Sequence, residues 1–346
     1  MKKRINNLLQ AIKKNSLDGF ITKNAADINY LTGIDKAEGW LLISANHKLI
    51  FFTTRIYAKT TTNLSCLKIV VIKKDFKEAL VRKVKKLKLK KIGFSKQKIT
   101  LANYQKINKA FNLKNIDLIS SRPLISNLRI KKDKSEIKLI KKAASVSLEA
   151  FDYAKEIFSQ TMTEKDLAIE LERFLKIKSD NKIAFPTIVA SDKNTVCAHH
   201  SPKETLINNF FLIDLGAMHC GYCADLTRIF FWGKMPSLFQ KVHDTIKKAH
   251  ATAISKIKEG KKASEIDKVA REIIEKSGFG KYFLHGLGHG VGLEVHEPPY
   301  LGPNQDNILK EGMVVTIEPG IYYKNQFGIR LESMVAIKSK SCEVLG

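Results

Sequence analysis

The chain has 346 residues, of which 44% are hydrophobic, and its formal net charge is +26. That apolar fraction is typical of a globular protein long enough for two hydrophobic cores, and it excludes wholesale disorder. No apolar run is long enough to span a bilayer, and the basic N-terminus lacks the continuous apolar stretch of a signal peptide, so the sequence predicts a cytoplasmic protein without a membrane partner.

The excess positive charge lies almost entirely in the first 132 residues. They contain 30 basic and 7 acidic residues, a net charge of +23, whereas the rest of the chain has a net charge of +3. Such asymmetry is typical of surfaces that bind nucleic acid or another polyanion. However, only nine of the 60 basic residues are arginine, which base and phosphate recognition favour. We therefore expect a solvated lysine-rich surface, with polyanion binding as the less favoured alternative.

The first 130 residues alternate between helical and strand-like patterns. Apolar spacing predicts helices over 2–15, 76–90 and 101–112. Strands are predicted at 18–23, at 40–54 as a hairpin, and at 67–74, 91–95 and 116–120. This order predicts a small α/β domain with a mixed sheet over residues 1–130. The proline and charge run of residues 121–136 marks a junction, and a second domain follows over residues 134–346.

The second domain repeats one order of elements twice. Ser135 is expected to cap a helix to residue 158, and Thr161 with Glu164 to open a second helix to residue 178. Strands are predicted at 183–190, 209–217 and 223–232. Helices over 236–259 and 264–277, the latter opened by Ser264 and Asp267, then precede strands at 291–296, 313–318 and 328–337. The repeat predicts a duplicated α+β fold with pseudo-twofold symmetry and a site where the halves meet.

Five potential metal ligands lie in order along this second domain: Asp214, Asp225, His289, Glu318 and Glu332. Each is in or beside an apolar strand or a glycine-rich turn, where an uncompensated carboxylate is costly to bury. Four carboxylates and one imidazole suit Mn²⁺, Fe²⁺, Co²⁺ or Zn²⁺. Two ions sharing these ligands would hold a hydroxide and polarise a carbonyl oxygen, which is chemistry suited to amide hydrolysis.

Two neighbouring motifs have weaker meanings. Cys220 and Cys223 form a CxxC at the turn between the two aspartate strands, and we expect an incidental hairpin there, with a peripheral metal or redox role as the alternative. The glycines of residues 285–302 are expected to let the backbone pass close to the metals and the substrate. Along that segment, a turn would point His289 inward and place His296 at the far end of the next strand.

Residues 134–346 resemble the catalytic domain of the pita-bread metallopeptidases, which include methionine aminopeptidase, prolidase and Xaa-Pro aminopeptidase. The matching stretches are IDLGAMHCGYCADLTRIF, GLGHGVGLEVHEPP, VVTIEPGIY and GIRLES. The first 130 residues resemble the creatinase-type, ribonuclease H-like N-terminal domain of the proline-specific members. The resemblance therefore implies a creatinase-type domain followed along the chain by a pita-bread catalytic domain.

This resemblance implies an activity and its partners. The main expectation is a dinuclear Xaa-Pro aminopeptidase that acts on proline-containing peptides, and the alternative is an Xaa-Pro dipeptidase, or prolidase, restricted to dipeptides. Mn²⁺ or Co²⁺ is the expected metal, with Zn²⁺ or Fe²⁺ possible, and a homodimer is expected. A non-enzymatic binding module on the same fold is the remaining alternative.

The resemblance also implies metal-binding roles. Asp214 would chelate one metal and His289 would complete the other, while Asp225 and Glu332 would bridge both. Glu318 would bind metal and accept the proton of the bridging water.

Three further residues would serve the substrate. His296 would contact it and steady the tetrahedral intermediate, and Arg330 would orient Glu332 or a substrate carboxylate. His199, three residues before Pro202, matches the family's remaining active-site histidine, with the adjacent His200 as the alternative.

Overall fold

The computed structural model describes residues 2–35, 37–58, 67–73, 75–232 and 235–346, so residue 74 of the predicted strand 67–74 lies outside the described part. Contacts within the chain divide it into two compact units, Met1–Arg129 and Ile130–Gly346. In the described part of the first unit, one hydrophobic cluster contains Leu42, Phe52 and Phe111, and further buried side chains such as Leu8 and Phe51 lie outside it, while two clusters fill the second unit. Among the described residues, no helix is long and apolar enough to cross a membrane.

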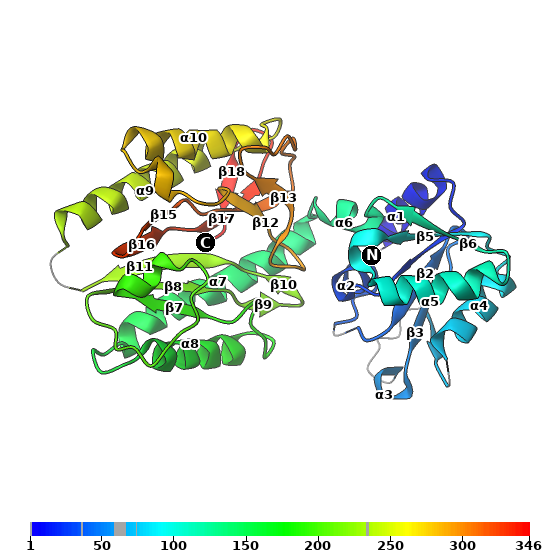
Figure 1. The fold of residues 1–346 in the computed structure, drawn as a ribbon. Coiled ribbons are helices and arrows are strands. Elements are labelled where there is room, and N and C mark those ends of the chain that lie inside the picture. The colour runs from blue at the N-terminus through cyan, green and yellow to red at the C-terminus, as the bar shows by residue number, and fades with distance from the viewer. Residues whose placement is uncertain (1, 36, 59–66, 74, 233–234) are drawn as a thin grey trace. The chain divides into compact units, whose positions relative to one another are not determined.

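The first unit is an α/β domain (Figure 1). Its six-stranded sheet has the order β4-β3-β2-β1-β5-β6. Its pairs are both parallel and antiparallel, which confirms the predicted mixed sheet. The strands are β1 Gly19–Thr22, β2 Trp40–Ser44, β3 Leu49–Thr53, β4 Leu67–Val71, β5 Lys91–Ser95 and β6 Asp117–Ser121. The helices are α1 Lys2–Lys14, α2 Ala25–Thr32, α3 Arg55–Ala58, α4 Phe76–Lys86, α5 Leu101–Asn112 and α6 Leu124–Arg129.

The first half of the second unit packs two helices against a three-stranded antiparallel sheet in the order β11-β8-β7. The connection between the two longer strands β8 and β11 contains a small hairpin, in which a two-residue turn joins β9 to β10. The elements are α7 Lys134–Ile157, α8 Glu164–Lys178, β7 Ile188–Ser191, β8 Phe210–Leu215, β9 Met218–His219, β10 Tyr222–Cys223 and β11 Leu226–Phe231.

The second half again has two helices and then strands. Its main sheet has the order β13-β12-β14-β17-β18, and β15 pairs with β16 in a separate hairpin. The helices are α9 Ser237–Lys256 and α10 Ala263–Lys276. The strands are β12 Gly288–Gly290, β13 Glu297–Leu301, β14 Val314–Ile317, β15 Gly320–Tyr323, β16 Phe327–Arg330, β17 Ser333–Ile337 and β18 Cys342–Val344.

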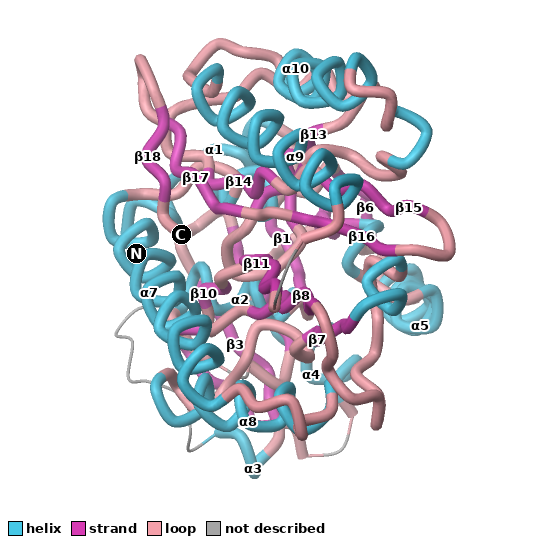
Figure 2. The backbone as a smooth tube through the Cα atoms, turned by 90° about the vertical axis from the view of Figure 1, so that its left-hand side faces the viewer, coloured by secondary structure: helices cyan, strands magenta, loops and turns pink. Residues whose placement is uncertain are grey.

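The two halves of this unit face each other across their strands. Figures 1 and 2 show the pair α7 and α8 on one side, the pair α9 and α10 on the opposite side, and the strands between them. Apolar side chains of each helix pair fill one of the two clusters. This duplicated arrangement confirms the predicted α+β pita-bread architecture, and it leaves the polar site where the two sets of strands meet.

The helix caps differ from those predicted. Asp133 caps α7 in place of Ser135, because its carboxylate accepts hydrogen bonds from the backbone of the first turn and Glu136 completes a capping box. Thr163 caps α8 in place of Thr161, and its box is completed by Asp166. Both predictions placed the cap two residues from its true position, because several Ser, Thr and Asp residues compete at each helix start.

The second-half helix α10 begins without any side-chain cap, so its predicted opening by Ser264 and Asp267 is wrong. Asp267 is buried instead, where it pairs with Arg271 and accepts a hydrogen bond from the backbone N–H of Leu287 at 3.0 Å. Its carboxylate thereby ties α10 to the segment that leads into β12.

Two predicted strands are broken at the places where the site lies. Residues 291–296 form a loop between β12 and β13, so His296 is in that loop and His289 is in β12 itself. The predicted strand 328–337 divides into β16 and β17, which belong to different sheets. Glu332 lies at this break, whereas the predicted strand 328–337 would have placed it in mid-strand. Its backbone N–H donates to the carbonyl oxygen of Thr227 in β11 at 3.2 Å. This bond holds the segment between β16 and β17 against the first half of the unit.

Candidate metal centre

The first half contributes two buried aspartates. Asp214 lies in β8 opposite Thr227 of β11, and Asp225 lies immediately before β11. One oxygen of Asp214, Oδ2, accepts a hydrogen bond from Arg330 at 2.6 Å. Its other oxygen, Oδ1, is buried and has no hydrogen-bond partner among the described residues. Burying a carboxylate oxygen without a hydrogen-bond partner destabilises the fold, unless a bound ion contacts that oxygen.

The carboxyl group of Asp225 lies close to three other carboxyl groups, those of Glu332, Asp214 and Glu318. Burial raises its pKa well above the usual range, and nearby carboxylates, Glu332 foremost, raise it further. Burial also raises the pKa of Asp214, against the opposing charge of Arg330. Both aspartates are thus in surroundings where their ionised forms are unfavourable without an additional positive charge.

His289 comes from β12 in the second half, and the backbone fixes its ring. Its Nδ1 lies 3.1 Å from the carbonyl oxygen of Gly290, to which it donates, so Nε2 carries the lone pair. That Nε2 is 3.5 Å from an oxygen of Asp225 and 3.3 Å from an oxygen of Glu318. Burial lowers the pKa of His289 to about 4, so the ring is neutral and able to coordinate a metal at neutral pH.

The two glutamates complete the cluster from the same half. Glu318 directly follows β14 and accepts a hydrogen bond from Thr316 at 3.0 Å, and burial raises its pKa to about 7. Glu332 accepts a hydrogen bond from Thr227 at 2.7 Å. Burial raises the pKa of Glu332 well above its usual range, and the charge of Glu318 raises it further.

The five predicted ligands therefore converge on one buried place. Potential ligand atoms lie within 4.8 Å of one another in three overlapping groups: Asp214, Asp225 and Glu332; His289, Glu318 and Glu332; and Asp225, His289 and His296. Oxygen and imidazole nitrogen make a hard to borderline set that fits divalent first-row metals. The crowding of carboxylates and the bare oxygen of Asp214 both fit bound cations.

Arg330 is the main positive charge of the protein inside this cluster. Besides Asp214, it donates to the hydroxyl of Tyr322 at 2.9 Å and to Thr227 at 3.0 Å. Because Thr227 in turn donates to Glu332, the guanidinium orients two of the five predicted ligands, one of them through a hydroxyl. Of the two roles expected for Arg330, these bonds favour orientation of Glu332 over capture of a substrate carboxylate.

A cavity of about 930 Å³ opens onto the cluster. His296 reaches it from the loop after β12, with its ring centroid 4.2 Å from that of His289. The wall combines the polar residues of the cluster with apolar side chains. The apolar part of the wall includes Phe185, Ile188, Leu284, Val295 and Tyr300.

The two adjacent histidines, His199 and His200, have different surroundings. His199 is exposed and lines the cavity. His200 is buried, and its Nε2 lies 2.7 Å from Glu164. The placement of the two rings favours His199 as the substrate-side histidine and gives His200 a structural contact.

Glu164 anchors the loop that carries both histidines. Its buried carboxylate accepts hydrogen bonds from the backbone of Ser191 at 2.6 Å and of Lys203 at 3.0 Å, and from the side chain of Asn194 at 2.9 Å. Together with His200, these bonds hold both ends of the loop. Sequence reasoning placed Glu164 in a helix cap, and no pattern along the chain indicated its function.

Three strand residues beside the site were also missed. Thr227, Thr316 and Tyr322 are ordinary strand residues in the sequence, and only their hydrogen bonds to the cluster distinguish them. His285 lines the cavity and its Nε2 lies 3.1 Å from the hydroxyl of Tyr322, while burial lowers its pKa to about 4. Its position in a histidine- and glycine-rich segment was a weak signal for this role.

Two glycines allow β12 to bring His289 into place. A Cβ on Gly288 would lie 2.1 Å from the carbonyl oxygen of Thr316, and one on Gly290 would lie 2.4 Å from that of Pro298. The glycines thus permit close approach to the neighbouring backbone of the sheet. The expected close approach of this backbone to metals and substrate remains a prediction.

Comparisons with known proteins match both units of the chain. A family model described as Metallopeptidase family M24 matches residues 138–339, and one described as Creatinase/Prolidase N-terminal domain matches residues 4–131. The Xaa-Pro dipeptidase of Pyrococcus furiosus is 31% identical over 347 aligned residues, which cover 100% of this chain and 98% of the relative.

Solved structures are also similar over nearly the whole chain. An Xaa-Pro dipeptidase from Bacillus anthracis has a TM-score of 0.94 at 30% identity, covering 99% of this chain and 97% of the other. An X-Pro aminopeptidase from Thermotoga maritima has a TM-score of 0.87 at 33% identity, covering 95% of each chain.

Proposed function

The chain belongs to metallopeptidase family M24, and we propose that it is a dinuclear hydrolase of the Xaa-Pro bond that prefers Xaa-Pro dipeptides. The observation that carries the proposal is the convergence of four carboxylates and one histidine in one buried cluster, in which one oxygen of Asp214 has no hydrogen-bond partner among the described residues. Asp214, Asp225, His289, Glu318 and Glu332 are the proposed ligands.

Two relatives that match over nearly the whole chain favour the dipeptidase over the aminopeptidase that the resemblance alone put first. Relatives from two Pyrococcus species, each 31% identical over nearly the whole chain, are named Xaa-Pro dipeptidase. The Thermotoga structure carries the aminopeptidase name at similar identity. The preference for dipeptides is therefore the part of the proposal that most needs a direct test.

The proposed chemistry assigns separate tasks to the side chains. Bound divalent ions supply a nucleophile at neutral pH and polarise the scissile carbonyl. We assign to Glu318, which lies beside His289 in the cluster, the acceptance of a proton from water and its transfer to the leaving amine. His199 and His296 line the cavity, where we assign them hydrogen bonds to the substrate.

The apolar wall suits the other half of the substrate. We place the proline ring against the side chains of Phe185, Leu284 and Tyr300, which line the same cavity as the cluster. A cavity that combines apolar walls with a few convergent polar groups is typical of a small-ligand site.

Peptide length is the variable that tests the proposal. Purified full-length protein loaded with Mn²⁺ should release alanine from Ala-Pro at least about tenfold faster than from Ala-Pro-Ala. The reason is that the proline of the longer peptide lacks the free carboxylate that a dipeptide-preferring site would bind. Ala-Ala is the control for proline recognition. Equal or faster release from the tripeptide would contradict the preference for dipeptides, and no release from either proline peptide would contradict the hydrolase itself.

A further inference from the structure

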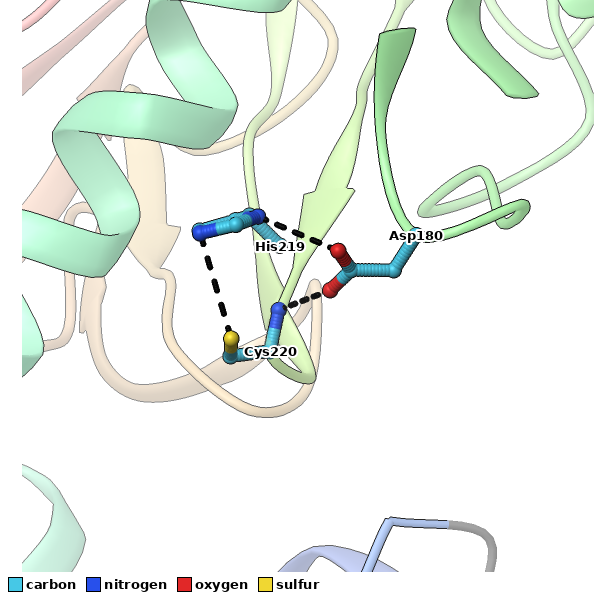
Figure 3. Close-up of side chains that lie close together, drawn as sticks. All are labelled: Asp180, His219 and Cys220. Carbon is cyan, nitrogen blue, oxygen red and sulfur yellow. Dashed lines mark hydrogen bonds and ion pairs between the residues drawn. The ribbon is translucent and has the colours of Figure 1, made fainter. Parts of the chain in front are cut away.

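A separate group of metal-ligating side chains lies at the surface of the second unit. It consists of Asp180, which follows α8, together with His219 at the end of β9 and Cys220 in the turn to β10 (Figure 3). Within the described part of the chain, none of the three lines the cavity of the proposed active site. Cys220 is exposed, whereas the other cysteine of the CxxC, Cys223, is buried.

The three side chains point toward one another. His219 Nδ1 lies 3.3 Å from one oxygen of Asp180, and His219 Nε2 lies 3.8 Å from the sulfur of Cys220. One potential ligand atom from each residue lies within 4.8 Å of the other two. The backbone N–H of Cys220 also donates to the second oxygen of Asp180, so the carboxylate holds both the ring and the turn.

These separations fit a tetrahedral ion. With metal–sulfur and metal–nitrogen bonds of the usual zinc lengths, a tetrahedral angle separates the two ligand atoms by about 3.6 Å. The observed separation of Cys220 Sγ and His219 Nε2 is 3.8 Å. A carboxylate on the other ring nitrogen, as Asp180 provides, is the common arrangement that orients a metal-binding histidine.

The turn holds the thiol in an unusual backbone conformation. Cys220 has φ 49° and Gly221 has φ 81°, which together make a two-residue hairpin turn with both residues in the left-handed region. Asn-Gly or Asp-Gly is the usual sequence for such a turn, so a cysteine at the first position is not explained by turn chemistry. The conformation places the thiol on the same side as the ring of His219 (Figure 3).

We propose that Asp180, His219 and Cys220 form a second metal site, for a zinc-class ion, at the tip of the hairpin between the strands of the catalytic aspartates. Thiolate and imidazole select borderline ions over Mg²⁺ and Ca²⁺, and the proposed catalytic ligands include no sulfur. Binding requires the thiolate, so the thiol proton passes to solvent when the sulfur–metal bond forms. Water completes the coordination, because the site is open to solvent.

Cobalt is the probe that separates this site from the catalytic one. Reduced full-length protein titrated with Co²⁺ should develop a thiolate-to-cobalt charge-transfer absorption in the near ultraviolet, and once all sites are filled its amplitude should correspond to one cobalt–thiolate bond per chain. Oxygen and nitrogen ligands do not produce this band. Zn²⁺ should displace the cobalt and abolish the band. Absence of the band in the parent protein would overturn the proposal.

Matched variants locate the ligands. Cys220→Ser should abolish the band, and Asp180→Ala should weaken cobalt binding by about 10–100-fold, as expected for loss of an orienting carboxylate, with His219→Ala weakening it at least as much. Cys197→Ser changes another exposed cysteine and should retain the band. Asp225→Asn changes a proposed catalytic ligand and should retain it too. A band that survives Cys220→Ser, or that disappears with Cys197→Ser or Asp225→Asn, would contradict the site.

Discussion

The hydrogen-bonded pair of Asp214 and Arg330 partly offsets the negative charge of the cluster. The guanidinium holds one oxygen of Asp214 at 2.6 Å and reaches Glu332 through the hydroxyl of Thr227. Among the described side chains, Arg330 is the main buried cation that faces the four carboxylates, and burial raises the pKa of all four. Such a site is costly as bare protein and becomes favourable when divalent ions bind.

Asp225→Asn tests this balance directly. The amide keeps the shape of the side chain but removes an ionisable group and a proposed bridging ligand. We expect kcat on Ala-Pro to fall on the order of a thousandfold, because metal chemistry supplies several kcal/mol to the transition state. The metal-free variant should be more stable than the metal-free parent by about 1–3 kcal/mol, measured by urea denaturation. Unchanged activity, or a destabilised metal-free variant, would contradict the assignment.

The two adjacent histidines offer a matched pair of variants. His199→Ala removes an exposed cavity residue, so kcat should fall by about 100-fold while the free energy of unfolding stays within about 0.5 kcal/mol of the parent.

His200→Ala should behave in the opposite way. It leaves one bond of the buried Glu164 carboxylate unmade, which should cost about 1–3 kcal/mol of stability. Steady-state kinetics and urea denaturation of both proteins give the comparison. If the two variants exchanged these effects, His200 and not His199 would be the active-site histidine.

At the scale of elements, the site depends on how closely β12 packs against its neighbours. The strand is only three residues long, and its register shifts between His289 and Gly290. The glycine on each side of His289 lets the backbone approach β13 and β14 more closely than any side chain would allow. The short strand thus fixes the position of the His289 imidazole.

Gly288→Ala should displace β12 and with it the imidazole of His289. Its new Cβ would lie 2.1 Å from the carbonyl oxygen of Thr316, so β12 must move away from β14 and carry His289 with it. We expect a loss of about 2–4 kcal/mol of stability, measured by urea denaturation, and at least about a tenfold loss of Mn²⁺ affinity, measured by calorimetry. The control is Gly302→Ala, where the new Cβ would lie 3.7 Å from its nearest neighbouring atoms and stability should change little. Equal effects of the two changes would argue against the role of β12.

At the scale of the whole molecule, the proposed catalytic centre belongs to neither half of the second unit alone. Asp214 and Asp225 lie in or beside the strands packed on α7 and α8, and the other three proposed ligands lie in or beside strands on the side of α9 and α10. Bound ions should therefore fasten the two halves together. A homodimer and polyanion binding by the lysine-rich first unit stay predictions.

Removal of the metals should reverse the pH dependence of stability in a defined range. Without metal, the folded protein raises the pKa of Glu318 from its ordinary value of 4.5 to about 7. Between these pH values the folded state binds more protons than the unfolded chain, so the free energy of unfolding falls as pH rises. The contribution of Glu318 is about 3 kcal/mol.

Urea denaturation of chelator-treated protein at pH 5 and pH 7, with Mn²⁺-loaded protein as the reference, measures this difference. Ions that neutralise the carboxylates should stabilise the protein most at pH 7, because acid protonates the ligands and weakens metal binding. A metal-free protein that is more stable at pH 7 than at pH 5 would contradict the predicted crowding.

The amino-acid sequence alone determined most of the elements and the identity of the candidate ligands. Helical and alternating patterns are local properties, so α5 and the hairpin of β2 and β3 could be predicted almost to the residue. Carboxylates in apolar segments, such as Asp214 and Glu318, stand out because their burial is unfavourable without a cation. The match of these motifs to a known family supplied their expected roles.

Tertiary structure alone decided the surroundings of those ligands. The break at Glu332, the bonds of Arg330 and the burial of His200 against Glu164 depend on segments far apart in the chain. The same holds for the surface group of Asp180, His219 and Cys220, in which a residue after α8 meets a hairpin some 40 positions later. Hydrogen bonds between distant segments follow from packing, and packing leaves no periodic signal in the sequence.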